Sequence, residues 1–220
     1  LSLMGSIQVI SNELGKFITF EGGEGAGKST QIKRLSKFLK TKGHITVLTR
    51  EPGGSNGGED IRRLLVDGDI DRWDPVSETL LHMAARRSHL VDLIKPALRR
   101  GEWVLCDRFA DSTEAYQGHG QSLDLGFISQ LRRTIVGATE PELTFLLDIS
   151  VDEGLARALA RGNIARYERM DRSIHEKIRF GFLKIAAENE QRIITIDASQ
   201  SIDAIEAEII KHTVQRFELA

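Results

Sequence analysis

The chain has 220 residues, of which 40% are hydrophobic and 28% charged, and its formal net charge is −2. A charge this close to zero argues against a nucleic acid polymer as the main partner, because such partners attract strongly basic proteins. Cys106 is the only cysteine, which excludes an intrachain disulfide and a cysteine-based zinc site and fits a cytoplasmic protein. No apolar run approaches the ~20 residues that span a bilayer, so we expect no membrane partner.

Residues 1–16 lack the basic start and long apolar stretch of a signal peptide, and we interpret them as an N-terminal extension, either native or left from expression. From residue 17 onward, short apolar or β-branched runs alternate with stretches of helical spacing. Strands are predicted at 17–20, 45–49, 103–106, 143–147 and 193–196. Helices are predicted at 28–42, 59–66, 74–100, 112–117, 123–136, 152–161, 172–189 and 202–217.

In the predicted helix 74–100, Asp74 is the expected N-cap, Pro75 the first residue, and Pro96 the site of a bend or an end. Five strands separated by helices predict an α/β fold, in which a five-stranded parallel sheet carries helices on both faces. Because we find no linker or repeat, we expect a single domain over residues 17–220.

Residues 22–29 (GGEGAGKS) match the pattern G-x-x-x-x-G-K-[ST] between a predicted strand and a predicted helix. The glycines let backbone N–H groups approach phosphates, and the helix N-terminus adds a favourable dipole. We expect Lys28 to reach the β- and γ-phosphates of a nucleoside triphosphate and Ser29 to bind Mg²⁺. The fold is then a P-loop NTPase-type three-layer sandwich. The predicted triphosphate-binding residues are Gly22, Gly23, Glu24, Gly25, Ala26, Gly27, Lys28, Ser29 and Thr30.

Glu24 is an acid inside this loop, where it would repel phosphates unless a cation intervenes. It could act through Mg²⁺ or a metal-bound water, or it could orient a second substrate. A solvated loop tip without a role is the remaining interpretation.

Other charged residues follow the predicted strands at their carboxyl ends, where open α/β sheets bind ligands. Arg50 follows the second strand, and Asp107 and Arg108 follow the third. Guanidinium groups bind phosphate in a bidentate manner, so we expect Arg50 and Arg108 near the phosphate loop. Asp107 is placed to bind Mg²⁺ through water or to orient an arginine. A surface salt bridge is the alternative for any one arginine.

The charged segment at about 162–171 is a predicted short lid, with Arg161 beside it and Arg166 within it. A lid that supplies a guanidinium would stabilise the charge on a phosphoryl group during transfer. A solvated basic loop fits the sequence equally well.

From Lys16 to about Phe217 the chain resembles bacterial thymidylate kinases. The residues that carry the resemblance are 21–30 (EGGEGAGKST), 49–54 (TREPGG), 84–86 (AAR), 107–109 (DRF), 112–118 (STEAYQG) and 196–198 (IDA). Many nucleotide enzymes share the first of these motifs. The second, fourth and fifth, in this order and spacing, are specific to thymidylate kinases.

The resemblance implies transfer of the ATP γ-phosphate to dTMP, for dTTP synthesis by de novo and salvage routes, with Mg²⁺ as cofactor and a cytoplasmic homodimer as the assembly. It implies catalytic roles for Lys28, Asp107, Arg108 and Arg166, metal binding by Ser29 and Asp107, and contact with ATP by Arg161. The implied dTMP-binding residues are Glu24, Arg50, Pro52, His82, Arg86, Arg108, Thr113, Tyr116 and Gln117.

Members of this family carry a catalytic arginine either in the phosphate loop or in the lid. This loop has Gly25 and Ala26 instead, so the chain resembles the lid type, and we predict Arg166 as the catalytic arginine with Glu168 orienting the lid arginine. His82 is a departure, because the family usually has a phenylalanine there that stacks on thymine. An imidazole offers less stacking area than a phenyl ring.

Three other functions share some of these features. Another nucleoside or nucleoside-monophosphate kinase would have the phosphate loop without the TREPGG and YQG motifs. A GTP-dependent switch would carry an Asn-Lys-x-Asp motif, which this sequence lacks. A noncatalytic module would bind ATP without releasing ADP in response to dTMP.

Overall fold

A computed structural model describes residues 14–162 and 166–219. Most of the predicted N-terminal extension and residues 163–165 of the predicted lid lie outside the described residues. One parallel sheet with the strand order β2-β3-β1-β4-β5 forms the centre of the described chain. Its strands are β1 (Phe17–Glu21), β2 (Thr46–Arg50), β3 (Trp103–Asp107), β4 (Leu143–Asp148) and β5 (Ile193–Asp197). The predicted α/β fold with five parallel strands is confirmed.

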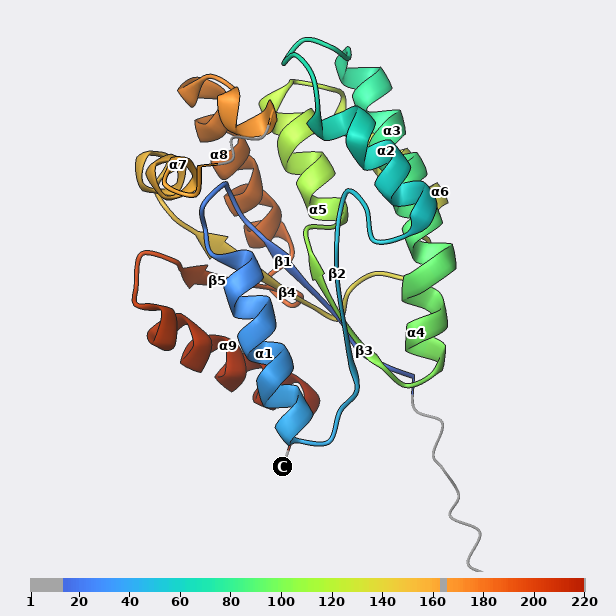
Figure 1. The fold of residues 1–220 in the computed structure, drawn as a ribbon, viewed down its shortest axis with the longest axis vertical. Coiled ribbons are helices and arrows are strands. Elements are labelled where there is room, and N and C mark those ends of the chain that lie inside the picture. Colours follow the sequence, from blue (N-terminus) through green and yellow to red (C-terminus); the bar gives the residue numbers. More distant parts are fainter. Residues whose placement is uncertain (1–13, 163–165, 220) are drawn as a thin grey trace, which may run out of the picture.

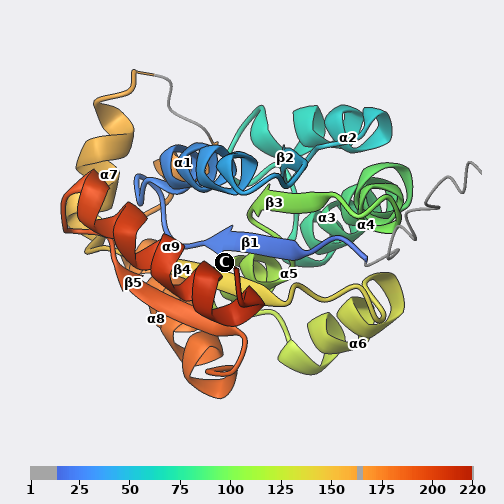
Figure 2. The ribbon, with the colours of Figure 1, turned by 90° about the horizontal axis from the view of Figure 1, so that it is seen from below.

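Helices cover both faces of this sheet. The helices α1 (Lys28–Thr41) and α9 (Ile202–Phe217) lie side by side on one face, in front of the strands in Figure 1. Figure 2 shows α1 on one side of β1 and α5 and α6 on the other. The second face carries α3 (Pro75–His89), α4 (Lys95–Arg99), α5 (Ala110–Thr113), α6 (Leu125–Ile135) and α8 (Arg172–Glu188), while α2 (Asn56–Val66) packs on α3 and α7 (Val151–Leu159) follows β4.

Side chains of β1 alternate between two hydrophobic cores. Ile18 and Phe20 pack toward α1 and α9 with Leu35, whereas Phe17 packs on the opposite face with Leu90. All of β4 except its last residue is buried, as expected for a central strand of a parallel sheet. Because the central strands are buried on both faces of the sheet, the loops at its carboxyl edge start from rigid strand ends.

The predicted helix 74–100 is divided into three segments. Between α3 and α4 lies a π-helical turn, Leu90–Ile94 (η1), and Pro96 stands in the first turn of α4. Proline lacks the N–H that would continue the α-helical ladder, which accounts for the irregular turn that precedes it. The predicted cap is confirmed: Asp74 Oδ1 accepts from the N–H groups of Val76 at 2.9 Å and Ser77 at 3.1 Å.

The helix α2 begins at Asn56, three residues before its predicted start. The Ser55 hydroxyl caps it by accepting from Gly58 N at 3.2 Å. The sequence did not predict this start, because the first turn contains Gly57 and Gly58 and glycine disfavours helices. Among the described residues, no helix has the length and apolar character needed to cross a membrane.

Replacing the cap of α3 tests how far this helix depends on its first turn. We expect Asp74→Ala to lower the free energy of unfolding by about 1 kcal/mol, because two N–H groups lose their acceptor. The melting temperature would fall by roughly 2–4 °C in a domain of this size. Denaturant unfolding of Asp74→Ala beside Asp71→Ala, an exposed aspartate outside the helix, provides the measurement. Equal losses in the two variants would contradict the capping role.

Candidate active site

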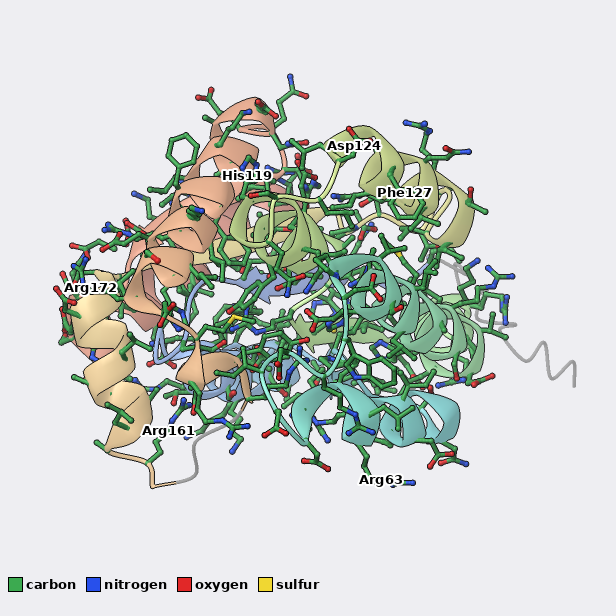
Figure 3. The ribbon with its side chains drawn as sticks, turned by 90° about the horizontal axis from the view of Figure 1, so that it is seen from above. Arg63, His119, Asp124, Phe127, Arg161 and Arg172 are labelled. Carbon is green, nitrogen blue, oxygen red and sulfur yellow. The ribbon has the colours of Figure 1, made fainter. Side chains whose placement is uncertain are left out.

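A cavity of about 340 Å³ opens at the carboxyl ends of β1, β2 and β3. Figure 3 looks onto this edge of the sheet. The cavity brings together nearly all of the predicted site residues: Glu24, Gly25, Ala26, Gly27, Lys28, Ser29, Thr30, Arg50, Pro52, His82, Arg86, Asp107, Arg108, Thr113, Tyr116, Gln117 and Arg161. Gly22 and Gly23 line a small adjacent cavity behind the loop.

The phosphate loop leaves its helix N-terminus open for an anion. Gly27 is the N-cap of α1, with φ of 88°, and has no side chain that could occupy the first N–H groups of the helix. Lys28 Nζ donates to Gly22 O at 3.1 Å and to Gly23 O at 2.9 Å. Burial lowers the pKa of this ammonium to about 8, and the nearby Arg108 acts in the same direction. A bound phosphate would offset both effects.

Two oxygen ligands lie together beside Lys28. Ser29 Oγ donates to Asp107 Oδ2 at 2.6 Å, which brings the end of β3 to the start of α1. A hydroxyl and a carboxylate are the hard ligands that Mg²⁺ prefers when water and phosphate complete its coordination. These residues therefore fit a magnesium ion. In the described part of the chain no group of three or more His, Cys, Asp or Glu side chains could hold a metal, and a phosphate-bound Mg²⁺ requires no such group.

Arg108 adopts a backbone conformation that is rare for its residue type. Its φ is 68°, in the left-handed region that favours glycine. Its side chain donates to Gly22 O and to Glu24 Oε1, both at 2.9 Å, and its guanidinium lies 5.0 Å from the Tyr116 ring centroid. Such strain persists only where the surroundings fix it, and it gathers at functional sites. Here it directs a half-buried guanidinium toward the phosphate loop.

Glu24 is not a solvated loop tip. Its side chain is 17% exposed, and Oε1 accepts from Arg108 and, at 2.7 Å, from the Tyr116 hydroxyl. Burial alone would raise the pKa of Glu24, but the charges of Arg108 and Lys28 outweigh burial and lower the pKa to about 2. The ionised carboxylate thus fixes Arg108 and Tyr116 in the cavity wall.

Arg86 lies at the other end of the cavity in a network of buried polar groups. It is 2% exposed, and it donates to Glu51 Oε2 at 2.7 Å, Thr113 Oγ1 at 3.0 Å and Phe109 O at 3.0 Å. The Glu51–Pro52 peptide bond, next to the carboxylate that pairs with Arg86, is cis. A cavity lined by the phosphate loop and by this hydrogen-bonding arginine suits a nucleotide.

Comparison with known proteins agrees with this geometry. The family model described as thymidylate kinase matches residues 20–209. The chain belongs to the thymidylate kinase family. It is therefore a kinase that phosphorylates dTMP, which confirms the resemblance deduced from the motifs.

Two relatives and one solved structure illustrate the family. The thymidylate kinase of Caulobacter vibrioides is 53% identical over 205 residues, which cover 93% of this chain and 99% of that protein. That of Magnetococcus marinus is 48% identical over 204 residues, covering 92% and 97%. The crystal structure of thymidylate kinase from Ehrlichia chaffeensis superposes with a TM-score of 0.75 at 34% identity, covering 90% of this chain and 98% of that one.

The imidazole of His82, where the family usually has phenylalanine, lines the cavity. His82 Nε2 and the Tyr167 hydroxyl lie 2.9 Å apart. Burial lowers the pKa of His82 to about 3, and the charges of Arg86 and Arg166 add to this effect. The ring is therefore neutral at physiological pH and forms an uncharged part of the cavity wall.

The two arginines of the predicted lid differ in what they contact. Arg161 is 58% exposed at the end of α7, where Figure 3 labels it, and it lines the cavity and donates to Glu168 Oε1 at 2.9 Å. Arg166 is buried, is not among the cavity-lining residues, and binds three backbone carbonyls and Glu78. These contacts keep the Arg166 guanidinium away from the cavity. Its role as the catalytic arginine stays a prediction.

The phosphate loop has no room for an arginine at the two positions considered above. A Cβ at Gly25, whose φ is 69°, would lie 2.0 Å from the backbone oxygen of Gly154. Ala26 is 1% exposed and belongs to the core beneath α1. An arginine at either of these two positions of the loop is therefore excluded by packing.

Sequence reasoning missed Arg62 of α2 and Tyr167. Arg62 lines the cavity and donates to Pro52 O at 2.7 Å, whereas its neighbour Arg63 is exposed and pairs with Asp60. Figure 3 shows Arg63 at the outer side of the molecule. The rotation of α2 about its axis turns Arg62 toward the cavity and Arg63 toward solvent. No motif in the sequence predicts this rotation.

Glu21 lies behind the phosphate loop and supports a pH prediction. It is 1% exposed and accepts from Phe109 N at 2.7 Å and Ser112 Oγ at 2.6 Å. Burial raises the pKa of Glu21 from 4.5 to about 7, and the charge of Asp111 adds to this effect. The folded protein therefore binds more protons than the unfolded chain between these two values.

Stability contributed by Glu21 should fall as the pH rises from about 4.5 to about 7. We expect the free energy of unfolding of the wild type, minus that of Glu21→Gln, to decrease over this interval by an amount of the order of 2 kcal/mol. Denaturant unfolding of both proteins at several pH values measures this difference. A difference that stays flat or rises with pH would contradict the raised pKa.

Proposed function

We propose that this chain transfers the γ-phosphate of ATP to dTMP, with Mg²⁺ as cofactor, in the cavity at the carboxyl edge of the sheet. One observation carries the proposal: a helix N-terminus that can bind a triphosphate and a half-buried arginine, Arg108, face the same cavity, and Glu24 connects them. A site with two anion-binding groups suits a reaction between two phosphates.

In this proposal the donor phosphates bind the backbone of the phosphate loop and Lys28. Ser29 and Asp107 hold Mg²⁺, which would neutralise part of the charge of the transferred phosphoryl group. The acceptor phosphate binds Arg108 with Arg50 nearby, and Tyr116 lies against the deoxyribose. Arg86 and Thr113, already joined by a hydrogen bond of 3.0 Å, receive the thymine edge.

Transfer is expected to be direct, without a covalent enzyme intermediate. The acceptor phosphate is an anion at neutral pH and needs little help from a general base. The main obstacle is the repulsion between two anions, which Lys28, Arg108 and Arg50 offset by their charge. The fold supports a single kinase domain over residues 17–220 with a short lid at about 162–171. The family supports a homodimer in the cytoplasm. Light scattering of the purified protein would test the homodimer.

The proposed acceptor can be tested against related nucleotides. In a coupled assay of ADP release, we expect dTMP to give the highest kcat/KM among dTMP, dUMP, dCMP, dGMP and AMP. This expectation follows from the roles that the proposal gives to Arg86 and Thr113 at the thymine edge and to Tyr116 at the deoxyribose, all three of which line the cavity. Activity on AMP but not on dTMP would reject the proposal, and ATP binding without any ADP release would identify a noncatalytic module.

Arg161 takes the catalytic role in this proposal, because it is the lid arginine that lines the cavity. We expect Arg161→Ala to lower kcat by ~10²-fold or more, in line with other arginines that stabilise phosphoryl transfer. The KM for dTMP should change little. Arg172→Ala, an exposed arginine paired with Asp152, is the control and should retain its kcat. If kcat is unchanged in Arg161→Ala, the transferred phosphoryl group is stabilised by another residue.

A further inference from the structure

Arg166 and Glu78 form an ion pair in which both side chains are 0% exposed. A buried charge of this kind is tolerated only when its hydrogen-bonding groups are satisfied. Arg166 meets this condition by donating to Leu65 O at 3.0 Å, Ile70 O at 2.8 Å and Asp69 O at 3.0 Å. One guanidinium thus ties the end of α2 and the segment after it to α3, which carries Glu78.

The carboxylate of Glu78 joins this pair to the wall of the cavity. Its Oε1 accepts from Gln117 Nε2 and from Gln121 Nε2, both at 2.8 Å. Gln117 is buried and lines the cavity beside Tyr116 and Thr113. The Glu78 carboxylate therefore links Arg166 to Gln117, which lies in the part of the site that we assign to the acceptor.

Tyr167 and Glu168, which follow Arg166 in the chain, both line the cavity. They belong to the short 3₁₀ turn Arg166–Arg169, so their positions depend on where Arg166 is anchored. The Tyr167 hydroxyl pairs with His82, and the Tyr167 ring stands edge-on to Tyr116 with centroids 5.7 Å apart. Glu168 accepts from Arg161. The turn thereby contacts the acceptor wall through one residue and the proposed catalytic arginine through the next.

We propose that Arg166 is a positioning residue, whose buried pair with Glu78 sets Tyr167 against the acceptor wall and Glu168 against Arg161. The inference rests on the proposed function, since it assigns this turn to the acceptor side of the site. It makes dTMP binding and phosphoryl transfer depend on the same anchor. ATP binding, which the phosphate loop provides, does not depend on it.

Arg169 offers a matched control within the same turn. It is exposed, and its Nη2 donates to Gly68 O at 2.6 Å, in the same segment after α2 that Arg166 holds. Arg169 differs from Arg166 in its partner, which is a backbone carbonyl and not Glu78, and in its exposure to solvent. Exchanging each arginine for lysine keeps the charge and removes the planar fork.

The experiment compares Arg166→Lys, Glu78→Gln, their double variant and Arg169→Lys, each checked for a cooperative thermal transition. The measurements are dTMP affinity without ATP, affinity for a nonhydrolysable ATP analogue without dTMP, and kcat. We expect Arg166→Lys and Glu78→Gln each to weaken dTMP binding and to lower kcat by about tenfold, since small displacements in a site have effects of this size. The ATP analogue should bind within about twofold of wild type in both, and Arg169→Lys should match the wild type throughout.

The double variant should lose no more dTMP affinity or kcat than the more strongly affected single variant, because both changes break the same interaction. Should either buried variant fail to fold, Tyr167→Phe tests the same inference at the cavity wall, where it removes the hydroxyl that contacts His82 and interacts with Glu78 and Arg166. It should weaken dTMP binding and leave the ATP analogue unaffected.

Several results would overturn the inference. A folded Arg166→Lys that binds dTMP normally but loses kcat would place Arg166 at the phosphates after all. Equal losses for dTMP and the ATP analogue, or for Arg166→Lys and Arg169→Lys, would indicate a general disturbance of the fold. If the wild type fails to phosphorylate dTMP, the proposed function fails instead, and the binding comparison is repeated with the monophosphate that the acceptor assay identifies.

Discussion

Two phosphate-bearing anions must meet in one cavity, and the rest of the site follows from the cations that this requires. Arginines in or near a buried cavity would repel one another before any ligand arrives. Five of these arginines are each paired with a glutamate: Arg108 with Glu24, Arg86 with Glu51, Arg166 with Glu78, Arg161 with Glu168 and Arg50 with Glu59. The positive charge of the site is thus held in place, and largely compensated, before nucleotides bind.

Burial of these pairs separates the arginines by task. Arg86 and Arg166 face glutamates that are themselves almost completely buried, so breaking either pair would leave a charge in the interior. Arg50 and Arg161 are 52% and 58% exposed, so water can solvate their guanidinium groups when they leave their glutamates. The exposed arginines can therefore turn toward a phosphate, whereas the buried ones fix the walls against which the substrate rests.

Local sequence determined the strands, the phosphate loop and the cap of α3, because the residues that specify them are neighbours in the chain. The same holds for the residues that end β2 and β3, since parallel strands bring their carboxyl ends to one edge. The roles of Arg161 and Arg166 could not be distinguished in this way. The partner of Arg166 is 88 residues away along the chain, and nothing in the charged segment around it records that burial. Arg62 and Arg63 show the same limit within a single helix.

The absence of an arginine from the phosphate loop is a consequence of packing as well as a feature of the motif. Gly25 lies against the backbone of Gly154, which belongs to α7, and Ala26 fills a place in the core. The helix that prevents a side chain at Gly25 is the same helix that ends next to Arg161. Close packing of α7 on the loop thus excludes an arginine side chain at Gly25. The end of the same helix brings Arg161, the catalytic arginine of our proposal, to the cavity, where it donates to Glu168.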